Sequence, residues 1–315
     1  MQKKLISIVT NTFNEEKNIK ELYLGLLEQI KKIKLTADVD FEIIIIDNDS
    51  TDKTQEYIRL ICKDDINVKA IFNLKNYGHI RSTYYGKLQA SGDAIIWIVS
   101  DLQDPLELLP ELVLKWINGS KIVLLQRKSS NNNYLLEKIK SIYYKVLNLL
   151  SENPLLERVT GAGIYDKSVI DQLKKIEDPY PYFRGLLSEL FGKIETIEFN
   201  QPKRKFGITS NNFYTLYDMG MLALTKHSKK FLRIITIFGF LISLLSFLAG
   251  LFFLFYKLLY WDEFSVGVAP IILGVLFGFS FQIFMIGILG EYVGIILDHT
   301  RKLPHVIEKE RINFN

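Results

Sequence analysis

Two long uncharged runs in the C-terminal third constrain this 315-residue chain more than any other feature. The first covers residues 234–256, and the second covers residues 264–290 and includes Pro270 and several glycines, which transmembrane helices tolerate. As a helix the first run would be about 34 Å long, which is enough to cross a hydrocarbon core of about 30 Å. A pair of buried core helices is the alternative, and the length and purity of both runs disfavour it. The sequence therefore predicts a two-helix transmembrane hairpin at 233–297.

Charges beside these runs predict their orientation. Basic residues precede the first run (Lys226, Lys229, Lys230, Arg233) and follow the second (Arg301, Lys302). The positive-inside rule then places both termini in the cytoplasm, with a short loop outside and a cytoplasmic tail at 298–315. We expect an integral protein of the cell (plasma) membrane whose catalytic domain is cytoplasmic.

Residues 211–232 precede the hairpin and form a predicted juxtamembrane amphipathic helix. Phe213, Leu216, Met221 and Leu224 recur at near-helical spacing, and lysines follow them. This pattern favours a helix on the membrane surface, and an ordinary surface helix of the soluble domain is the alternative.

Composition excludes several other classes of protein. The net charge of +4 is small for this length, so no nucleic acid is expected as a partner. The single cysteine excludes an internal disulfide framework and a multi-cysteine zinc site.

Residues 1–210 alternate between apolar strand-like runs and helix-like segments. The expected strands are 5–10, 41–46, 68–72, 94–99 and 122–126; the expected helices are one capped by Asn14, then 52–62, 78–90 and 106–116. This alternation predicts an α/β domain with a Rossmann-like, mostly parallel sheet and helices on both faces.

Mostly polar residues follow each predicted strand, at the edge where such sheets bind ligands. The residues after the strands include Asn11, Phe13, Glu15, Asp47, Asn48, Asn76, His79, Arg81, Asp101, Gln103, Asp104 and Arg127. Carboxylates at the middle strands with bases at the third and fifth suit a divalent metal opposite a phosphate. Neither G-x-G-x-x-G after the first strand nor G-x-x-x-x-G-K-[ST] occurs, which disfavours a dinucleotide oxidoreductase and a P-loop ATPase. His79, a lone loop histidine, is interpreted as a polar surface residue, with a catalytic role as the alternative.

Several motifs resemble those of family 2 glycosyltransferases with the GT-A fold. They are Asn14-Glu15-Glu16, the run from Asp47 to Thr54 (DNDSTDKT), and Asp101-Leu102-Gln103-Asp104-Pro105. Phe183-Arg184-Gly185-Leu186, Arg204-x-x-Gly207 and the closing Gly290-Glu291-Tyr292-Val293-Gly294 resemble the polyprenyl-phosphate branch, which is similar to dolichyl-phosphate mannose synthases and bactoprenol-phosphate glucosyltransferases. The resemblance covers nearly the whole chain.

This resemblance implies inverting transfer of a sugar from a nucleotide-sugar to a polyprenyl phosphate, for modification of a cell-envelope glycan. It implies Mg²⁺ or Mn²⁺ at Asp101 and Gln103, and a catalytic pair of Asp101 and Asp104, with Asp104 orienting the reacting groups. The implied donor-binding residues are Asn11, Phe13, Glu15, Asp47, Asn48, Asn76 and Arg127, and Arg127 and Arg204 would hold phosphates of donor or acceptor. The resemblance implies that a homo-tetramer can form, as relatives in the branch can, and glycines of the second run offer close helix contacts.

Four positions depart from the family pattern. Val99 replaces the first acid of D-x-D, Asn11 replaces a proline, Asn48 replaces an aspartate, and Gly161 replaces the first acid of D-F-R-L-x-D, whose last position is Asp166. If the acid at 161 is a base in relatives, this protein does without it or uses another group.

The missing acids leave a second interpretation, a catalytically inactive glycosyltransferase-like membrane adaptor. The acids and bases retained at Asp47, Asp101, Arg127 and Arg204 weigh against it. A polysaccharide synthase is a third interpretation, but 201–205 lacks the Gln-x-x-Arg-Trp motif, and two spans cannot enclose a pore. The same argument disfavours a flippase or transporter.

Overall fold

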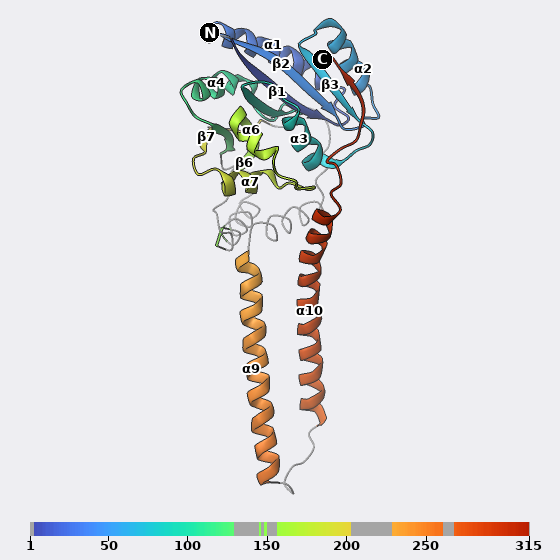
Figure 1. Ribbon diagram of the computed structural model, residues 1–315, viewed down its shortest axis with the longest axis vertical. Coiled ribbons are helices and arrows are strands. Elements are labelled where there is room, and N and C mark those ends of the chain that lie inside the picture. Colours follow the sequence, from blue (N-terminus) through green and yellow to red (C-terminus); the bar gives the residue numbers. More distant parts are fainter. Residues whose placement is uncertain are drawn as a thin grey trace.

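The computed structural model describes residues 3–128, 145, 148–149, 156–202, 229–260 and 268–314. In this part, a sheet with helices on both faces forms a domain from which two long helices extend on one side (Figure 1). The strands are β1 Lys4–Thr12, β2 Val39–Asp47, β3 Val68–Asn73, β4 Ala94–Val99, β5 Ile122–Arg127, β6 Val159–Asp166, β7 Glu195–Phe199 and β8 Glu308–Ile312. The helices are α1 Ile19–Lys34, α2 Thr54–Asp64, α3 Gly78–Leu88, the 3₁₀ turn η1 Leu106–Leu108, α4 Leu109–Ile117, α6 Lys167–Leu173, α7 Phe183–Leu190, α9 Lys229–Leu259 and α10 Val268–Thr300.

The strands form one eight-stranded sheet in the order β7-β5-β6-β4-β1-β2-β3-β8. β1 pairs in parallel with β2 and β4, and β2 pairs in parallel with β3, which confirms the mostly parallel α/β sheet. β6 is antiparallel to both of its neighbours and separates β5 from β4. The strand at 122–126 is therefore confirmed, but the sequence did not reveal the strand between it and β4.

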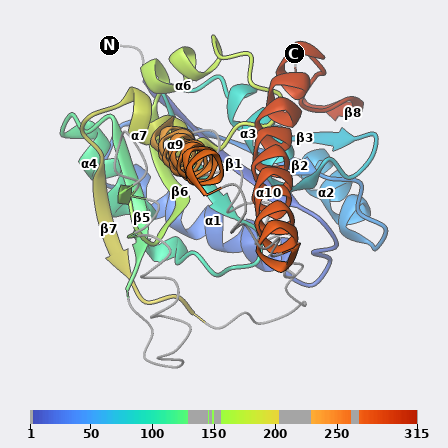
Figure 2. The same cartoon turned by 90° about the horizontal axis from the view of Figure 1, so that it is seen from below.

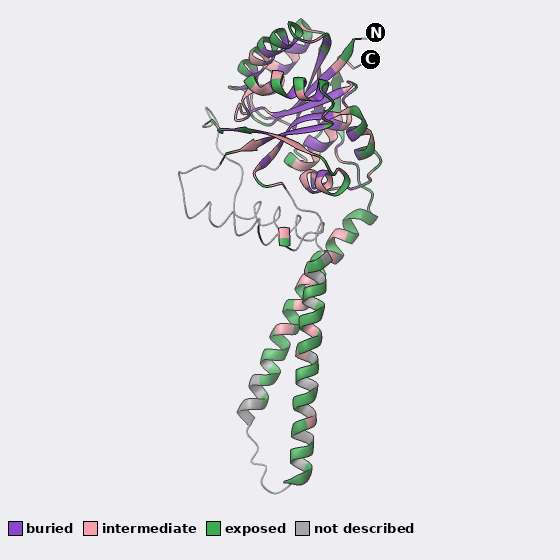
Figure 3. Ribbon diagram, turned by 90° about the vertical axis from the view of Figure 1, so that its left-hand side faces the viewer, coloured by how far each residue is buried: buried purple, intermediate pink, exposed green. Residues whose placement is uncertain are grey.

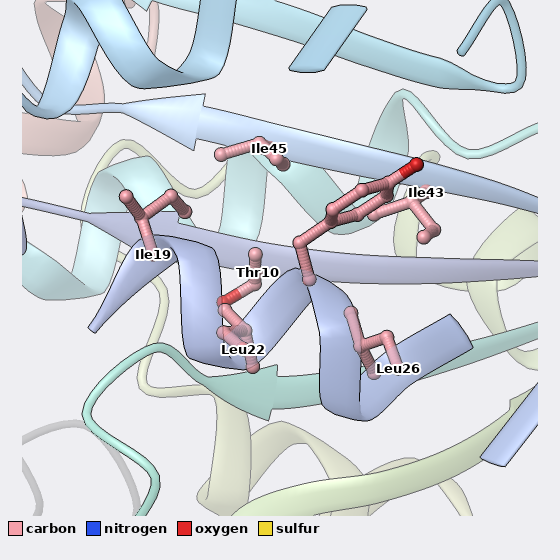
Figure 4. Close-up of a pocket in the computed structure, with 7 residues that line it drawn as sticks. Thr10, Ile19, Leu22, Leu26, Ile43 and Ile45 are labelled. Carbon is pink, nitrogen blue, oxygen red and sulfur yellow. The ribbon is translucent and has the colours of Figure 1, made fainter. Parts of the chain in front are cut away.

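Helices cover both faces of the sheet. α1, α2 and α4 pack together on one face, while α3 and α6 pack on the other, which is turned toward α9 and α10 (Figure 1). The apolar face expected for the first helix is confirmed, because Ile19, Leu22, Leu26, Ile30 and Ile33 of α1 are buried. A shallow apolar gap between α1 and the sheet, lined by Thr10, Ile43 and Ile45 among others, lies on the face away from the long helices (Figure 4).

The expected helix cap at Asn14 is wrong. α1 begins at Ile19 and is preceded by Asn18, whereas Asn14 has a φ of 57° in the left-handed region. Asparagine tolerates this conformation because its short polar side chain bonds locally. Here the Asn14 side chain accepts from the Thr51 N–H at 2.8 Å, and its own N–H donates to Ser50 Oγ at 2.9 Å. Asn14 therefore joins the loop after β1 to the loop after β2.

The two long helices contain most of both uncharged runs. Among the described residues, one stretch, Phe277–Thr300 of α10, is long and apolar enough to cross a membrane. Large apolar side chains of both helices are exposed, including Phe240 and Phe252 on α9 and Phe277 and Phe284 on α10 (Figure 3). Seen from below, α9 lies under the β6 and α7 side of the domain and α10 under the α3 side (Figure 2). The expected amphipathic helix at 211–232 falls mainly on residues outside the described ranges.

The segment after α10 returns to the domain and adds β8 to the sheet. β8 pairs antiparallel with β3, and Glu310 forms a bidentate ion pair with Arg59 of α2 at 2.7 Å for both bonds. Val306 is buried, and the Asn313 amide donates to the carbonyls of Cys62 and Val68. The predicted tail at 298–315 thus contributes the edge strand of the sheet, which its charged sequence did not indicate.

A buried carboxylate on β2, Glu42, connects β1 and β3. Glu42 lies beside Ser7 in the β1–β2 register and accepts from Ser7 Oγ at 2.5 Å and from the Ser91 N–H at 3.0 Å. Its other oxygen lies 2.7 Å from Lys69 Nζ. Burial alone would raise the pKa of Glu42, but the bonds from Lys69, Ser7 and Ser91 outweigh it and lower the pKa.

We expect Glu42→Gln to lower the free energy of unfolding by about 2 kcal/mol at neutral pH, because Lys69 loses its partner. A lowered carboxylate pKa contributes stability above the pKa of the unfolded chain, and this is lost as the pH falls through the folded value. The difference between the two proteins should therefore begin to shrink below about pH 4.3, the pKa of glutamate in the unfolded chain, and vanish only below the lowered pKa of the folded protein. Thermal unfolding at several pH values measures it.

Glu28→Gln is the matched control, because it breaks the exposed pair with Lys32. Such pairs contribute about 0.5 kcal/mol at most, so this variant should resemble the parent protein. Equal effects of the two substitutions would contradict the assigned role of Glu42.

Candidate active site

Asp47, the last residue of β2, is a fully buried carboxylate at the carboxyl end of the sheet. It accepts hydrogen bonds from Ser50 Oγ at 2.5 Å, the Ser50 N–H at 3.0 Å, Gln55 Nε2 at 2.7 Å and Thr12 Oγ1 at 3.2 Å. Burial raises its pKa, although these bonds oppose the rise. The carboxylate is held in one orientation, at the place where the sequence predicted a donor-binding residue.

Asn48 connects the ends of three strands to the start of α3. Its N–H donates to the Thr12 carbonyl at 2.9 Å, and its Oδ1 accepts from Asn73 Nδ2 and from the Tyr77 N–H, both at 3.0 Å. Its Nδ2 donates to Asn76 Oδ1 at 2.6 Å. The structure therefore brings the predicted residues Asn48 and Asn76 together.

Ser82 extends this network to Asn11. Its Oγ accepts from Asn11 Nδ2 at 2.8 Å and from Asn73 Nδ2 at 3.1 Å. Oδ1 of Asn11 and Oδ1 of Asn73 are buried acceptors without a hydrogen-bond partner in the described structure. Asn73 and Ser82 were missed in the sequence, where an Asn ending a strand and a Ser inside a helix carry no motif. The two acceptors leave the network able to bind a donor group of a ligand.

Phe13 and Glu15 take different positions in the loop after β1. Phe13 is exposed, so its ring is available to a ligand. Glu15 is buried; its Oε2 accepts from Asn18 Nδ2 at 2.5 Å, and its N–H donates to Thr54 Oγ1 at 2.8 Å. The Glu15 carboxylate therefore orders the start of α1 in this structure.

The loop after β4 carries the predicted catalytic acids. Asp101 accepts from the Gln103 N–H at 3.1 Å in a tight turn, in which Leu102 has a φ of 59°. Asp104 is buried and accepts from the Val99 N–H at 3.3 Å, while its other oxygen lacks a hydrogen-bond partner in the described structure. Burial raises the pKa of Asp104 to about 6, against the opposing effect of the Arg127 charge. The predicted residues of the fourth and fifth loops thus act on one another.

The oxygen donors of this loop are few for a metal site formed by the protein alone. The described residues contain no group of three or more His, Cys, Asp or Glu side chains that could hold an ion. Mg²⁺ is commonly held by one or two carboxylates together with substrate phosphates and water. Asp101 and Gln103 therefore fit an ion that arrives with a diphosphate.

The sequence also singled out Asp166, Gly161 and Arg204. Asp166 caps α6 by accepting from the Ser168 N–H, and it pairs in register with Ala94 at the start of β4. It therefore lies at the other end of the sheet from Asp101. Gly161 has a φ of 82°, a conformation that strains other residues. Arg204 lies outside the described residues.

The family model for glycosyl transferase family 2 matches residues 7–174, which is more than half of the chain. The chain belongs to glycosyl transferase family 2. The protein is thus a glycosyltransferase, and its domain is an α/β fold of the GT-A type with a mostly parallel sheet. Asp47, Asn48, Asp101, Gln103 and Asp104 all lie within the matched range.

Two relatives match over nearly their full length. The bactoprenol glucosyl transferase of Shigella phage SfV is 29% identical over 308 residues, covering 97% of this chain and 99% of the relative. A prophage bactoprenol glucosyl transferase homolog of Escherichia coli K12 is 29% identical over 305 residues, covering 96% and 98%.

Two solved structures illustrate the similarity of this chain to known structures. S. aureus TarS 1–349 has a TM-score of 0.45 and 18% identity, covering 72% of this chain and 66% of that one. The mannosyltransferase PcManGT from Pyrobaculum calidifontis, in complex with GDP-Man and Mn²⁺, has a TM-score of 0.45 and 12% identity, covering 95% and 88%.

Asn48→Asp should destabilise the domain by about 1–3 kcal/mol, because a carboxylate cannot donate to Asn76 Oδ1 and would face it oxygen to oxygen. Thermal or denaturant unfolding measures the loss. Asn200→Asp makes the same chemical change at an exposed site and should leave stability within about 0.5 kcal/mol. Equal stability of the two variants would refute the donor role of Asn48.

Proposed function

We propose that this glycosyltransferase moves a sugar from a nucleotide-sugar to a polyprenyl phosphate at the cytoplasmic face of the membrane, with inversion at the anomeric carbon. The product is a lipid-linked monosaccharide for modification of a cell-envelope glycan. The names of the two bactoprenol glucosyl transferase relatives support bactoprenol as the lipid and glucose as the first sugar to test.

One contact carries this proposal. Arg81 Nη2 of α3 donates to the Pro304 carbonyl, just beyond the end of α10, at 2.5 Å. The next residue along α3, Ser82, belongs to the polar network of Asn11, Asn48 and Asn73. The segment that follows the exposed apolar helix α10 is therefore bonded to α3, the helix that contributes Ser82 to the candidate donor site. That arrangement suits an enzyme with one soluble and one membrane-bound substrate.

The polar network supplies the groups needed to hold a nucleotide. Asp47 and the unpartnered acceptors of Asn11 and Asn73 can accept N–H or O–H donors from a base or ribose. Exposed Phe13 can stack on the base, and Arg127 can pair with a phosphate. Asp104, buried beside Arg127, would orient the reacting groups.

The acceptor phosphate is already an anion and needs little help from a general base. The difficult event is departure of the nucleoside diphosphate, on which negative charge accumulates. Asp101 and Gln103 would hold Mg²⁺ or Mn²⁺ on the diphosphate, and the ion would stabilise that charge. The catalytic acid that relatives carry at 161 is not required by this scheme.

Both long helices are assigned to the membrane in this proposal, with the catalytic domain and both termini in the cytoplasm. Exposed apolar side chains along α9 and α10 would be unfavourable in water, and basic residues stand at their domain-side ends. The inactive membrane adaptor is the competing function, and the residue departures at Val99 and Gly161 are what favour it.

A homo-tetramer is part of the proposal. A Cβ added at Gly274, Gly278, Gly287, Gly290 or Gly294 of α10 would meet no described atom within 4 Å, which leaves this helix able to pack closely against another. The mass of the protein in mild detergent, corrected for bound detergent, should equal four chains. A monomeric mass would refute the tetramer and leave the proposed reaction untouched.

The reaction is tested with membranes that contain the protein, a polyprenyl phosphate and a panel of radiolabelled nucleotide-sugars, beginning with UDP-glucose. We expect a labelled lipid that extracts into organic solvent and requires Mg²⁺ or Mn²⁺. Asp101→Ala should reduce its formation at least 100-fold, because the ion and diphosphate lose their carboxylate.

Asp171→Ala is the matched control, because Asp171 is a carboxylate of α6 that pairs only loosely with Lys174, at 4.0 Å. It should retain the activity of the parent protein. Absence of labelled lipid with every donor would favour the adaptor.

A further inference from the structure

Lys87 is a lysine buried in an aromatic cage. It lies on α3 with 1% of its surface exposed. Its Nζ is 3.4 Å from the ring centroid of Phe183, 4.3 Å from that of Trp97 and 5.4 Å from that of Tyr165. These rings come from α7, β4 and β6, so four elements converge on one amine. Lysine is almost never fully buried without a compensating partner.

One hydrogen-bond donor of this cage lacks an acceptor. Trp97 Nε1 is buried without a hydrogen-bond partner among the described residues. Beside it, the Lys87 amine lies against the rings of Phe183, Trp97 and Tyr165. Buried donors are normally satisfied, so a donor that remains unmatched indicates a missing group rich in acceptors. Phosphate oxygens are such a group.

Two more basic residues adjoin the cage. The His79 ring lies 5.8 Å from the Trp97 ring, and Arg184 follows Phe183 and donates to the Val159 carbonyl at 3.1 Å. His79 as a whole residue is exposed, but protein atoms surround its ring. This desolvation, together with nearby Lys87 and Arg184, lowers the pKa of His79 to about 4, and Asp101 opposes the shift. His79 is therefore neutral at pH 7 and offers a neutral N–H, while Arg184 offers a cation.

Gly161 borders the same cluster. A Cβ at this position would lie 3.7 Å from Trp97 Cζ3 and 4.0 Å from Arg184 Cγ. An acid here, as the family pattern has, would place a carboxylate beside these basic groups. With glycine, no carboxylate comes from this position, and the charge of Arg184 stays available to another anion.

The cluster also lies on the side from which a lipid would come. α3 and α7 are on the face of the sheet that is turned toward α9 and α10 (Figure 1). The Asp101 and Asp104 charges act on members of the cluster, Asp101 on His79 and Asp104 on Tyr165. The cluster thus lies near the candidate catalytic loop, on the side of the domain from which the long helices extend.

We infer that His79 and Arg184 bind the phosphate group of the acceptor, and that Lys87 supports them from beneath as a positioning residue. This rests on the proposed function and adds to it a subsite separate from Arg127 and Arg204. Burial lowers the pKa of Lys87 well below its usual value and so disfavours the charged amine, and a bound phosphate dianion would favour the charged form at short range. Lys87 would then lower the stability of the fold while it strengthens phosphate binding.

Lys87→Met tests the inference, because methionine fills similar space without charge. The full-length protein in mild detergent is titrated with farnesyl phosphate, with farnesol and with inorganic phosphate, followed by tryptophan fluorescence. We expect farnesyl phosphate to bind at least tenfold more weakly to the variant, with farnesol and UDP-glucose binding unchanged and the melting temperature equal or higher. In transfer assays the KM for the lipid should rise while the KM for the donor stays constant.

Lys4→Met is the matched control, because it removes a lysine stacked on Trp116 at 4.8 Å at the other end of the sheet. It should bind farnesyl phosphate as the parent does. If Lys87→Met fails to fold, Arg184→Gln provides the same test, with the same tenfold loss expected. If inorganic phosphate also binds more weakly to the variant, the subsite recognises the phosphate group alone. If only farnesyl phosphate binds more weakly, the subsite recognises the prenyl phosphate ester. Either result supports the subsite.

Unchanged farnesyl phosphate binding in the variants would overturn the inference, as would an equal loss for farnesol, which would mean that Lys87 only packs. Farnesyl phosphate binding no tighter than farnesol in the parent would also overturn it. These binding results are independent of catalysis. Absence of transfer from every nucleotide-sugar would refute the proposed function and leave the subsite to be judged on binding.

Discussion

The side-chain amide of Asn48 is the interaction on which the candidate site depends. It accepts from Asn73 and Tyr77 and donates to Asn76, so it needs both the oxygen and the nitrogen of an amide. A carboxylate, which the family pattern has at this position, supplies only acceptors. Through this group the ends of β1, β2 and β3 and the start of α3 are held as one unit, and the contact of Arg81 with Pro304 joins that unit to α10.

The two acids missing at Val99 and Gly161 change the charge around the catalytic loop. Compared with the family pattern, Val99 and Gly161 reduce negative charge around the catalytic loop, and Arg184 and Lys87 lie close by. Fewer acids favour anions on this face of the sheet, where in the proposed reaction a diphosphate and a lipid phosphate would come together. These two departures from the family pattern therefore act in the same direction.

The sequence predicted the parallel core well, because its strands are short apolar runs such as 94–99, and the residues that follow them meet at one edge by geometry alone. It failed where long-range contacts decide. β6 contains two glycines and was not distinguishable as a strand, and β8 is a charged segment that is extended because β3 offers it an edge. Asn14 resembled a cap until its bond with Thr51 showed another use. Lys87 gave no signal, since an isolated lysine in a helix normally lies in water and only the packing of α7 and β6 buries it.

The position of β8 has a consequence for biosynthesis. β3 is an edge strand without it, and exposed edges pair with other chains. Because β8 follows both long helices in the sequence, that edge stays open until the ribosome has produced α9 and α10. If these helices enter the membrane as they are made, the last strand can close the sheet only beside the bilayer. Completion of the catalytic domain is then coupled to membrane insertion, and a molecule that fails to insert keeps an aggregation-prone edge by which quality control can recognise it.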